Sequence, residues 1–264
     1  ARPGRGAEPS VARIELHWRD GRGQSGSAPL GSGFFVSRQG HAITAGHSIA
    51  KGRKRLAKVE SPTDVRMVAV LPDAAENAAD ANPLELEVTT VEEYPEIDLA
   101  LLALVEDPYS SHADPRAREL LEDGVARLLL EVPDHGTAVV LSGYPNNQKQ
   151  PYRTIGRLVD DAFLSEIGVR NEPSPGWLER MLGHGVRLAD LDTKRGHSGG
   201  PVFLADGSGV IGVCVSIMLL NGGGTGVEPL RFPLRYRSQI TVLIPSAEIV
   251  KRLQARGISW QESG

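Results

Sequence analysis

Short apolar segments separated by turns recur along almost the whole of this 264-residue chain, and this feature constrains its fold most. Segments this short and this closely spaced are typical of the strands of a β-barrel or sandwich. We predict a first set of strands at Val11–Trp18, Gly33–Val36, His41–Ala45, Val65–Leu71, Leu84–Thr90 and Leu99–Leu104, and a second set at Thr137–Leu141, Tyr152–Asp160, Val202–Leu204, Val210–Ser216 and Gln239–Leu243.

At 264 residues the chain could form one large domain or two small ones, and a pair of packed barrels of about a hundred residues each falls within that range. We expect a disordered N-terminal arm, a first barrel, a connection with a helix near Arg116–Glu122, a second barrel, and a C-terminal helix with a tail. The respective ranges are 1–10, 11–110, 111–130, 131–245 and 246–264. The last helix is predicted over Ser246–Ala255, with Ser246 as its N-cap.

One glycine-rich stretch fits a nucleophile whose own backbone also binds an anion. It reads Gly196-His197-Ser198-Gly199-Gly200-Pro201. When a serine hydroxyl attacks a carbonyl, the new oxyanion needs two N–H donors, and a side chain on a flanking residue would obstruct them. An ordinary tight turn between strands is the alternative reading of this stretch taken alone.

A histidine and an aspartate each lie beside a predicted strand. His47 follows a strand and the small pair Ala45-Gly46, which would lift it out of a sheet edge. Asp98 directly precedes the apolar strand Leu99–Leu104, where burial of a carboxylate is costly unless a partner donates a hydrogen bond. An imidazole N–H is such a donor, so His47 is a candidate base and Asp98 its partner. Asp107, in a turn-like setting after the same strand, is the competing acid.

The chain order His47, Asp98, Ser198, with the serine inside Gly-X-Ser-Gly-Gly-Pro, resembles that of the chymotrypsin-like serine proteases. Within that superfamily the sequence looks most like the bacterial trypsin-like peptidases, including the protease domain of the HtrA/Deg family without its PDZ domain. The resemblance covers residues 11–257, and it is also carried by Gly31-Ser32-Gly33, Leu141-Ser142-Gly143-Tyr144-Pro145 and Ile244-Pro245-Ser246-Ala247-Glu248-Ile249-Val250. It implies an all-β fold of two six-stranded antiparallel barrels with a C-terminal helix.

The same resemblance implies a serine endopeptidase that hydrolyses peptide bonds through an acyl-enzyme. His47 would accept the proton of Ser198, and Asp98 would hold the other ring nitrogen. The backbone N–H groups of Gly196 and Ser198 would form the oxyanion hole in the cleft between the barrels.

Two alternatives to an ordinary endopeptidase stay open. The first is a catalytically idle trypsin-like module that only binds. The second is a regulated effector protease dedicated to one protein partner. It is motivated by two long insertions, residues 161–187 and 218–238, which would border the cleft and hold it unformed until a trigger arrives.

Three residues are predicted to bind substrate. By resemblance, Asp192, six residues before Ser198, lies at the base of the primary pocket, where a carboxylate favours cleavage after Arg or Lys. Ser216 and Ile217 would line the same pocket. Ile217 stands where trypsin-like enzymes carry glycine, and its bulk there would occlude a long side chain. The alternative is that Asp192 pairs with Arg195 or with arginines in residues 231–237.

Activation by a new N-terminus is not expected. In animal trypsins such a terminus pairs with an aspartate just before the nucleophile, whereas His197 occupies that position here. We therefore predict that the chain needs no cleavage before Val11 for activity.

Composition argues against several other functions. The net charge is −4, and the dense basic cluster Lys51–Arg55 is expected to be a solvated loop, so no nucleic-acid partner is predicted. Cys214 is the single cysteine and lies in an apolar strand, which predicts a buried, inert thiol. The sequence shows no metal-ligand spacing and no phosphate-binding loop, so we expect no metal and no cofactor.

The expected partner is a protein or peptide substrate, and other domains of a longer polypeptide stay open as partners. Residues 1–10 lack the aromatic side chains through which HtrA relatives trimerise, which favours a monomer. There is no run of about twenty apolar residues, hence no membrane span, and no signal-peptide pattern. We expect a soluble prokaryotic protein and leave open whether it is cytoplasmic or extracytoplasmic.

Overall fold

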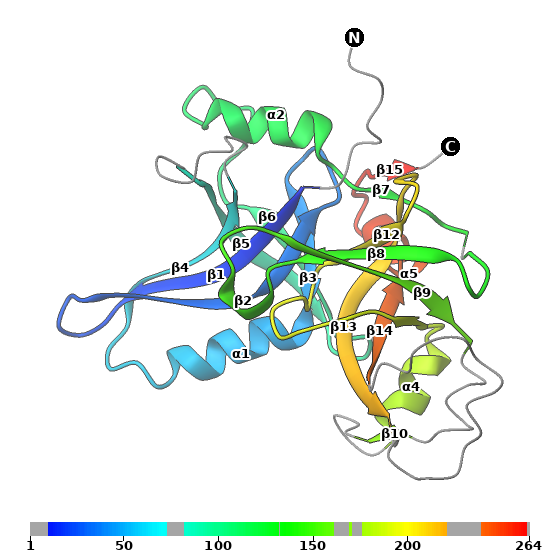
Figure 1. Ribbon diagram of the computed structural model, residues 1–264. Helices are drawn as coiled ribbons and strands as arrows, with labels where there is room; N and C mark the ends of the chain where they lie inside the picture. Colours follow the sequence, from blue (N-terminus) through cyan, green and yellow to red (C-terminus); the bar gives the residue numbers. More distant parts are fainter. Residues whose placement is uncertain are drawn as a thin grey trace.

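Six antiparallel strands form the first barrel of the computed structural model, which describes residues 10–72, 82–131, 133–160, 169–170, 176–220 and 239–262 (Figure 1). These strands are β1 (Val11–Arg19), β2 (Ser25–Phe35), β3 (His41–Ala45), β4 (Thr63–Leu71), β5 (Leu84–Tyr94) and β6 (Leu99–Leu104). They close in the order β1-β2-β3-β6-β5-β4, because β1 pairs with both β2 and β4. Each predicted strand is present, although β2 begins eight residues earlier than the predicted Gly33.

The second barrel is also closed by six antiparallel strands. These are β8 (Ala138–Gly143), β9 (Tyr152–Val159), β11 (Arg187–Asp190), β12 (Pro201–Leu204), β13 (Val210–Leu220) and β14 (Gln239–Pro245). Their order is β8-β9-β11-β14-β13-β12, and β12 closes the barrel by pairing with both β8 and β13. The predicted fold class is confirmed, but β11 was missed because it is short and directly follows the segment taken as an insertion.

Short parallel pairings attach the C-terminal tail to the second barrel. The two-residue strand β7 (Arg127–Leu128) pairs with β13, and β15 (Gln261–Glu262) pairs with β7. A third short strand, β10 (Val169–Arg170), pairs antiparallel with β13. The C-terminal tail is therefore part of the sheet.

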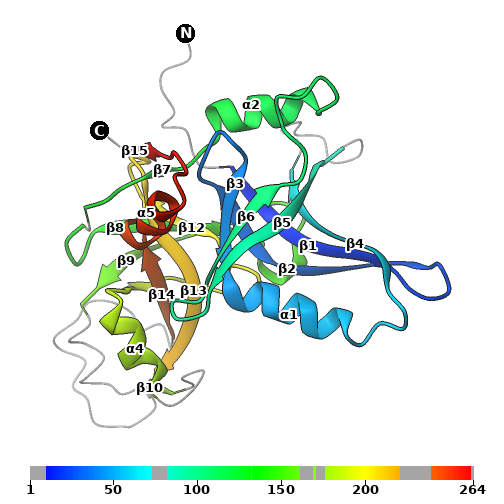
Figure 2. The same cartoon turned by 180° about the vertical axis from the view of Figure 1, so that it is seen from behind.

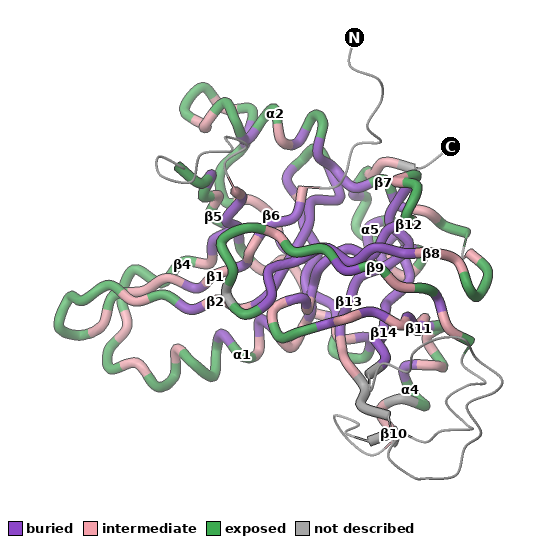
Figure 3. The backbone as a smooth tube through the Cα atoms, viewed as in Figure 1, coloured by how far each residue is buried: buried purple, intermediate pink, exposed green. Residues whose placement is uncertain are grey.

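Alternate residues of β6 pack into two different cores. Leu99 and Leu101 enter the core between the barrels, whereas Ala100 and Leu102 enter the first barrel's own core. A strand buried on both faces has a continuous apolar sequence, which explains the run Leu99–Leu104. Figure 3 shows the resulting band of buried residues through both barrels.

The longer helices lie at the ends of the barrels. Helices α1 (Gly46–Leu56) and α2 (Pro115–Asp123) lie at opposite ends of the first barrel (Figure 2), and the second barrel carries α4 (Trp177–Gly183) and α5 (Ser246–Ala255). A 3-10 turn, η1, covers Pro145–Asn147. The helices predicted near Arg116–Glu122 and over Ser246–Ala255 are confirmed.

One predicted helix cap is wrong. Pro245 holds the N-cap position of α5, and Ser246 is already the first helical residue. The Ser246 hydroxyl instead donates to the carbonyl of Val210 at 2.6 Å, which attaches the start of α5 to β13.

The basic run Lys51–Arg55 is also corrected, because it belongs to helix α1 and not to a loop. Glycines at positions 46 and 52 lower helix propensity, so the sequence alone does not show this helix. Tertiary packing stabilises the helix instead: Ile49 is buried, and a Cβ on Gly52 would lie only 3.1 Å from the Leu30 methyl carbons.

Several expectations concern residues that the structure does not describe. The arm at 1–9, residues 161–168 and 171–175 of the first insertion, and residues 221–238 of the second lie outside the described residues. Among the residues described, Ser10 donates its N–H to the carbonyl of Gly124 at 2.8 Å. None of the described helices combines the length and the apolar character that crossing a membrane requires.

Candidate active site

His47 lies in the first turn of α1, immediately after β3, and Asp98 lies in the turn between β5 and β6. The Nδ1 atom of His47 is 2.7 Å from Asp98 Oδ2, and the backbone N–H of His47 donates to Asp98 Oδ1 at 2.6 Å. The first N–H groups of a helix have no partner within the helix, so this carboxylate satisfies one of them from outside. Asp98 thus fixes both the ring and the backbone of His47.

The backbone around Asp98 adopts a conformation that few residues accept. Its φ is 55°, in the left-handed region, where aspartate is more common than most residues that have a side chain. The Asp98 carbonyl accepts the N–H of Gly46 at 2.9 Å. Two backbone contacts with the start of α1 therefore hold the carboxylate beneath the imidazole.

Ser198 lies in the turn that leads into β12 and faces the same cleft as His47 and Asp98. The cleft has a volume of about 830 Å³ and also exposes Gly196, Ser216 and other residues of both barrels. No hydrogen bond joins the Ser198 hydroxyl to His47 in the described part of the chain. In free enzymes such bonds are often long and tighten when substrate binds.

The peptide bond before Gly196 is oriented by the second barrel. The carbonyl of Arg195 accepts the N–H of Asn146 at 2.8 Å. Because the C=O and N–H of a trans peptide point in opposite directions, the Gly196 N–H points away from this contact. Neither this N–H nor that of Ser198 has a backbone acceptor among the described residues, so both are free to donate to a ligand in the cleft.

Glycine is required at position 196. Its φ is 104°, and a Cβ would lie only 2.2 Å from the carbonyl oxygen of Tyr144. A side chain there would push the turn away from η1 and change the direction of the N–H. The glycine singled out in the sequence is thus explained by the close approach of two loops.

Ser32 of β2 holds the turn around Ser198, and the sequence analysis did not assign it a role. Its hydroxyl donates to the Gly196 carbonyl at 2.6 Å and accepts the N–H of Tyr144 at 2.9 Å, while its own N–H donates to the Ser198 carbonyl at 2.8 Å. The sequence does carry one sign of this role, because Ser32 is a polar residue between Gly31 and Gly33 at the otherwise apolar end of a strand. A Cβ on Gly31 would lie 2.6 Å from the Ser198 carbonyl oxygen.

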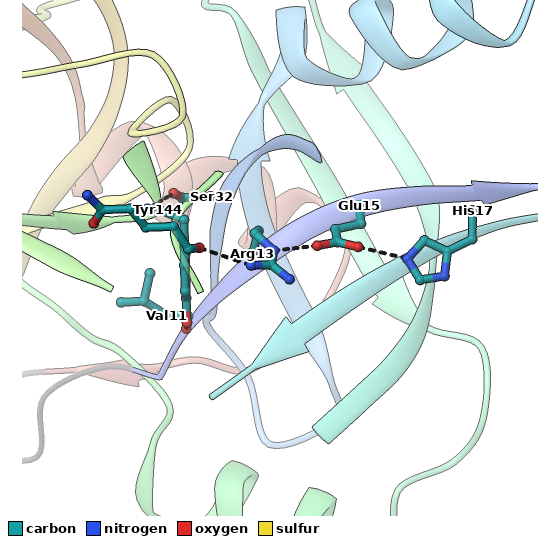
Figure 4. A network of polar contacts seen from close by, with 7 residues as sticks. Val11, Arg13, Glu15, His17, Ser32 and Tyr144 are labelled. Atoms are coloured by element: carbon teal, nitrogen blue, oxygen red, sulfur yellow. Dashed lines mark hydrogen bonds and ion pairs between the residues drawn. The ribbon is translucent and has the colours of Figure 1, made fainter. Parts of the chain in front are cut away.

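The same contacts continue outward along β1 (Figure 4). The Tyr144 hydroxyl donates to the Val11 carbonyl at 3.0 Å. Arg13 donates to the carbonyl of Gln148 at 2.9 Å and forms an ion pair with Glu15. The start of the first barrel is therefore fastened to the loop of the second barrel that contacts the turn around Ser198.

His197, next to Ser198 in the chain, is fully buried. Its Nδ1 accepts the backbone N–H of Lys194 at 3.0 Å, so the neutral ring carries its proton on Nε2. Burial, with a further contribution from the Lys194 charge, lowers the pKa of His197 to about 4. A neutral imidazole therefore occupies the place where animal trypsins have a carboxylate.

The structure does not bring Asp192 to the cleft. The Asp192 side chain is 46% exposed, and its carboxylate is 3.4 Å from the Lys194 ammonium. Its ion-pair partner is therefore a lysine, whereas the sequence analysis considered Arg195 and the arginines of residues 231–237. Asp192 is also absent from the residues that line the cleft, whereas Ser216 and Ile217 are among them. Two of the three predicted substrate-binding residues therefore share the cleft with Ser198.

Two other groups take no part in the site. Cys214 is completely buried, and burial raises the pKa of its thiol to about 12, as expected for an inert cysteine. Asp107, the competing acid, is exposed and accepts the N–H of Tyr109 within its own turn. The described residues contain no group of three or more potential metal ligands.

Solved structures with the same fold are proteases. The crystal structure of Deg5 is 21% identical over 96% of this chain and 93% of its own, with a TM-score of 0.54. The active form of the Rv3671c protease from M. tuberculosis is 20% identical over 98% and 85%, with a TM-score of 0.50. The HtrA-type protease AlgW with a decapeptide is 18% identical over 96% and 66%, with a TM-score of 0.56.

A comparison of the sequence with curated proteins found no match. The sequence model of the trypsin-like peptidase domain does match, over residues 31–213, which is more than half of the chain and includes His47, Asp98 and Ser198. By this match, and in agreement with its two-barrel fold, the chain belongs to the trypsin-like peptidase family.

Proposed function

We propose that this protein is a serine endopeptidase in which Ser198 is the nucleophile, His47 the general base and Asp98 the residue that orients the base. The observation that carries the proposal is the double contact of Asp98 with His47, at 2.7 Å to the ring and 2.6 Å to the backbone, beside a serine in the same cleft. Membership of a family of serine peptidases supports the reaction class.

The first half of the reaction follows from which nitrogen carries the proton. Because Asp98 accepts the Nδ1–H of His47, Nε2 keeps its lone pair and can accept the proton of Ser198 as the hydroxyl attacks the substrate carbonyl. The oxyanion that forms would accept the free N–H groups of Gly196 and Ser198, each worth about 3 kcal/mol in the transition state. His47 then gives its proton to the leaving amine, and an acyl-enzyme remains.

The second half repeats the same steps with water. Water attacks the acyl carbonyl while His47 accepts a proton, the oxyanion again accepts both N–H groups, and Ser198 leaves with the proton returned by His47. No further group is needed for the balance, since the net reaction adds one water across the peptide bond.

A preference for Arg or Lys at the bond that is cleaved is not part of this proposal. Such a preference depended on Asp192, which faces Lys194 outside the cleft. Val215, Ser216 and Ile217 of β13 do line the cleft, and they offer an apolar wall with one hydroxyl to the side chain before the scissile bond.

Labelling with a fluorophosphonate probe tests this function. We expect the wild-type protein to be labelled on Ser198 and to cleave an unfolded protein such as casein. Ser198→Ala should lose both reactions, whereas Ser111→Ala, which changes an exposed serine in a loop, should keep both. Absence of labelling in a correctly folded wild-type protein would favour the idle binding module instead.

A further inference from the structure

The charge on the walls of the cleft has one sign. Among the residues that the structure describes, the cleft is lined by Lys51, Arg55, Lys194 and Arg195, and by a single carboxylate, Asp98. Asp98 is already occupied by His47. A substrate that enters therefore meets unbalanced positive charge, in a cleft whose walls strengthen such a field.

Two of these cations form a line with the candidate base. His47, Lys51 and Arg55 follow one another at intervals of four residues on α1, which places them on one face of the helix. All three line the cleft. With a rise of about 1.5 Å per residue, Arg55 lies about 12 Å along the helix from His47, the length of about four residues of an extended peptide.

Arg195 joins this line from the second barrel. It directly precedes the oxyanion glycine, Gly196, and lines the same cleft as Lys51. Burial lowers the pKa of Lys51, the Asp98 carboxylate opposes this effect, and the Arg195 charge lowers the pKa further.

Three of the cleft cations have no counter-ion in the described ranges. No carboxylate there pairs with Lys51, Arg55 or Arg195, whereas Lys194 is paired with Asp192. On the same helix, Arg53, which does not line the cleft, forms an ion pair with Glu93. The cleft therefore presents three cations without a carboxylate partner among the described residues.

We propose that the cleft selects substrates with acidic side chains in the residues that follow the scissile bond, and that Lys51, Arg55 and Arg195 bind those side chains. The inference rests on the proposed function, and it names a substrate class for the same site. The direction follows from the chemistry, because His47 must protonate the leaving amine, so the leaving half of the peptide begins beside His47 and continues along the stripe on α1.

The test compares matched peptides. A library that is random on both sides of the scissile bond, cleaved by the wild-type protein and read by mass spectrometry, supplies a parent peptide. Two versions of that parent then carry two Glu or two Gln residues in the leaving half. We expect kcat/KM to be about tenfold higher for the Glu peptide at low salt, and the difference to vanish near about 1 M salt.

Charge reversal identifies the residues responsible. Lys51→Glu with Arg55→Glu, and separately Arg195→Glu, should remove or invert the preference, measured within each variant as the ratio of kcat/KM for the Glu peptide to kcat/KM for the Gln peptide. Lys54→Glu is the matched control, since Lys54 is exposed on the same helix but does not line the cleft. Equal cleavage of both peptides by the wild-type protein, or an unchanged preference in the reversed variants, would overturn the proposal.

A binding measurement separates this proposal from the proposed function. The Ser198→Ala variant should bind the Glu peptide more tightly than the Gln peptide in fluorescence anisotropy. If the wild-type protein cleaves no library member, two matched random-sequence peptide pools with two fixed Glu or two fixed Gln residues replace the parent peptide. If fluorophosphonate labelling of the wild-type protein fails while the variant still prefers the Glu peptide, only the proposal that the protein is a hydrolase is rejected. If the variant binds a DNA duplex but does not distinguish the peptides, the cationic wall serves a nucleic acid and the proposal is wrong.

Discussion

Asp98 is the residue whose contacts constrain the site most. Its two carboxylate oxygens bind two different N–H groups of His47, at 2.7 Å and 2.6 Å, from a backbone with a φ of 55°. An amide in its place can satisfy one of these donors with its oxygen, but its NH2 group must then face the other. The carboxylate is therefore matched to this geometry in a way that a neutral isostere is not.

We predict that Asp98→Asn lowers kcat by about 10⁴-fold while the protein stays folded. The NH2 group of the asparagine would face Nδ1 of His47 and favour the tautomer with its proton on Nε2, which cannot accept the serine proton. Peptide hydrolysis and far-UV circular dichroism measure the two effects. Activity within tenfold of the wild type would contradict the assignment of Asp98.

The buried His197 ring should make the stability of the folded protein depend on pH. The folded-state pKa of His197 is about 4, below its ordinary value of 6.5, so the unfolded chain takes up a proton in a range where the folded chain does not. The free energy of unfolding should therefore fall as pH falls from 6.5 to 4, by about 3 kcal/mol from this group. Denaturant titrations at several pH values measure it.

The control for His197 is the His197→Asn variant. Its amide oxygen can still accept the Lys194 N–H but does not titrate, and the other acidic groups contribute equally to both proteins. The difference in unfolding free energy between the two should change over this pH window. Parallel stability curves for wild type and variant would show that His197 is not held neutral.

At the scale of elements, β2 acts as a support for the nucleophile turn. Ser32 is the residue through which this strand of the first barrel binds Gly196, Ser198 and Tyr144 of the second. The contact lies away from the substrate, so Ser32 is a positioning residue. Its loss would leave the Gly196 carbonyl and the Tyr144 N–H without their partner, at a cost of about 1–3 kcal/mol each when buried.

We expect Ser32→Ala to reduce kcat by about 10- to 100-fold with little change in KM, because the oxyanion donors act mainly in the transition state. The rate of fluorophosphonate labelling should fall in parallel. Ser27→Ala, at an exposed position of the same strand, should leave both rates unchanged. A change in KM alone would place Ser32 in substrate binding instead of positioning.

At the scale of the whole molecule, the two barrels share one core and one set of polar contacts. Leu99 and Leu101 of the first barrel pack with Val213 and Ile244 of the second. Separation of the barrels would expose this core and pull the nucleophile turn away from Ser32. The site therefore depends on barrel packing and not on either barrel alone.

Removal of residues 1–9 should leave kcat/KM within about twofold of the value for the full chain. The position before the nucleophile is filled by the buried His197 ring, whose partner is the Lys194 N–H within the same turn. No ion pair with a chain terminus is needed there. Kinetic comparison of the full and shortened chains tests this, and strict dependence on a newly formed terminus would refute it.

The sequence was informative where chemistry restricts residue type. The motif around Ser198 and the carboxylate before β6 could be recognised because few residue types are compatible with those positions. The strands could be recognised by their runs of apolar residues. Helix α1 could not be predicted, since Gly46 and Gly52 are poor helix formers and its stability comes from packing on Leu30 and from Asp98. The position of Asp192 depended on which way one loop turns, a tertiary property that spacing does not encode.

The burial of Cys214 has a practical consequence. The carbonyl of Cys214 accepts the Gly199 N–H at 2.7 Å, directly behind the nucleophile turn, yet its thiol is sealed from solvent and the chain has no second cysteine. A cysteine introduced at an exposed position would therefore be the sole reactive thiol of this 264-residue chain in its folded state. A dye or spin label could be attached beside Lys54 or on the α2 surface without first replacing a native cysteine. Distances between this label and a labelled substrate in the cleft could then be measured during turnover.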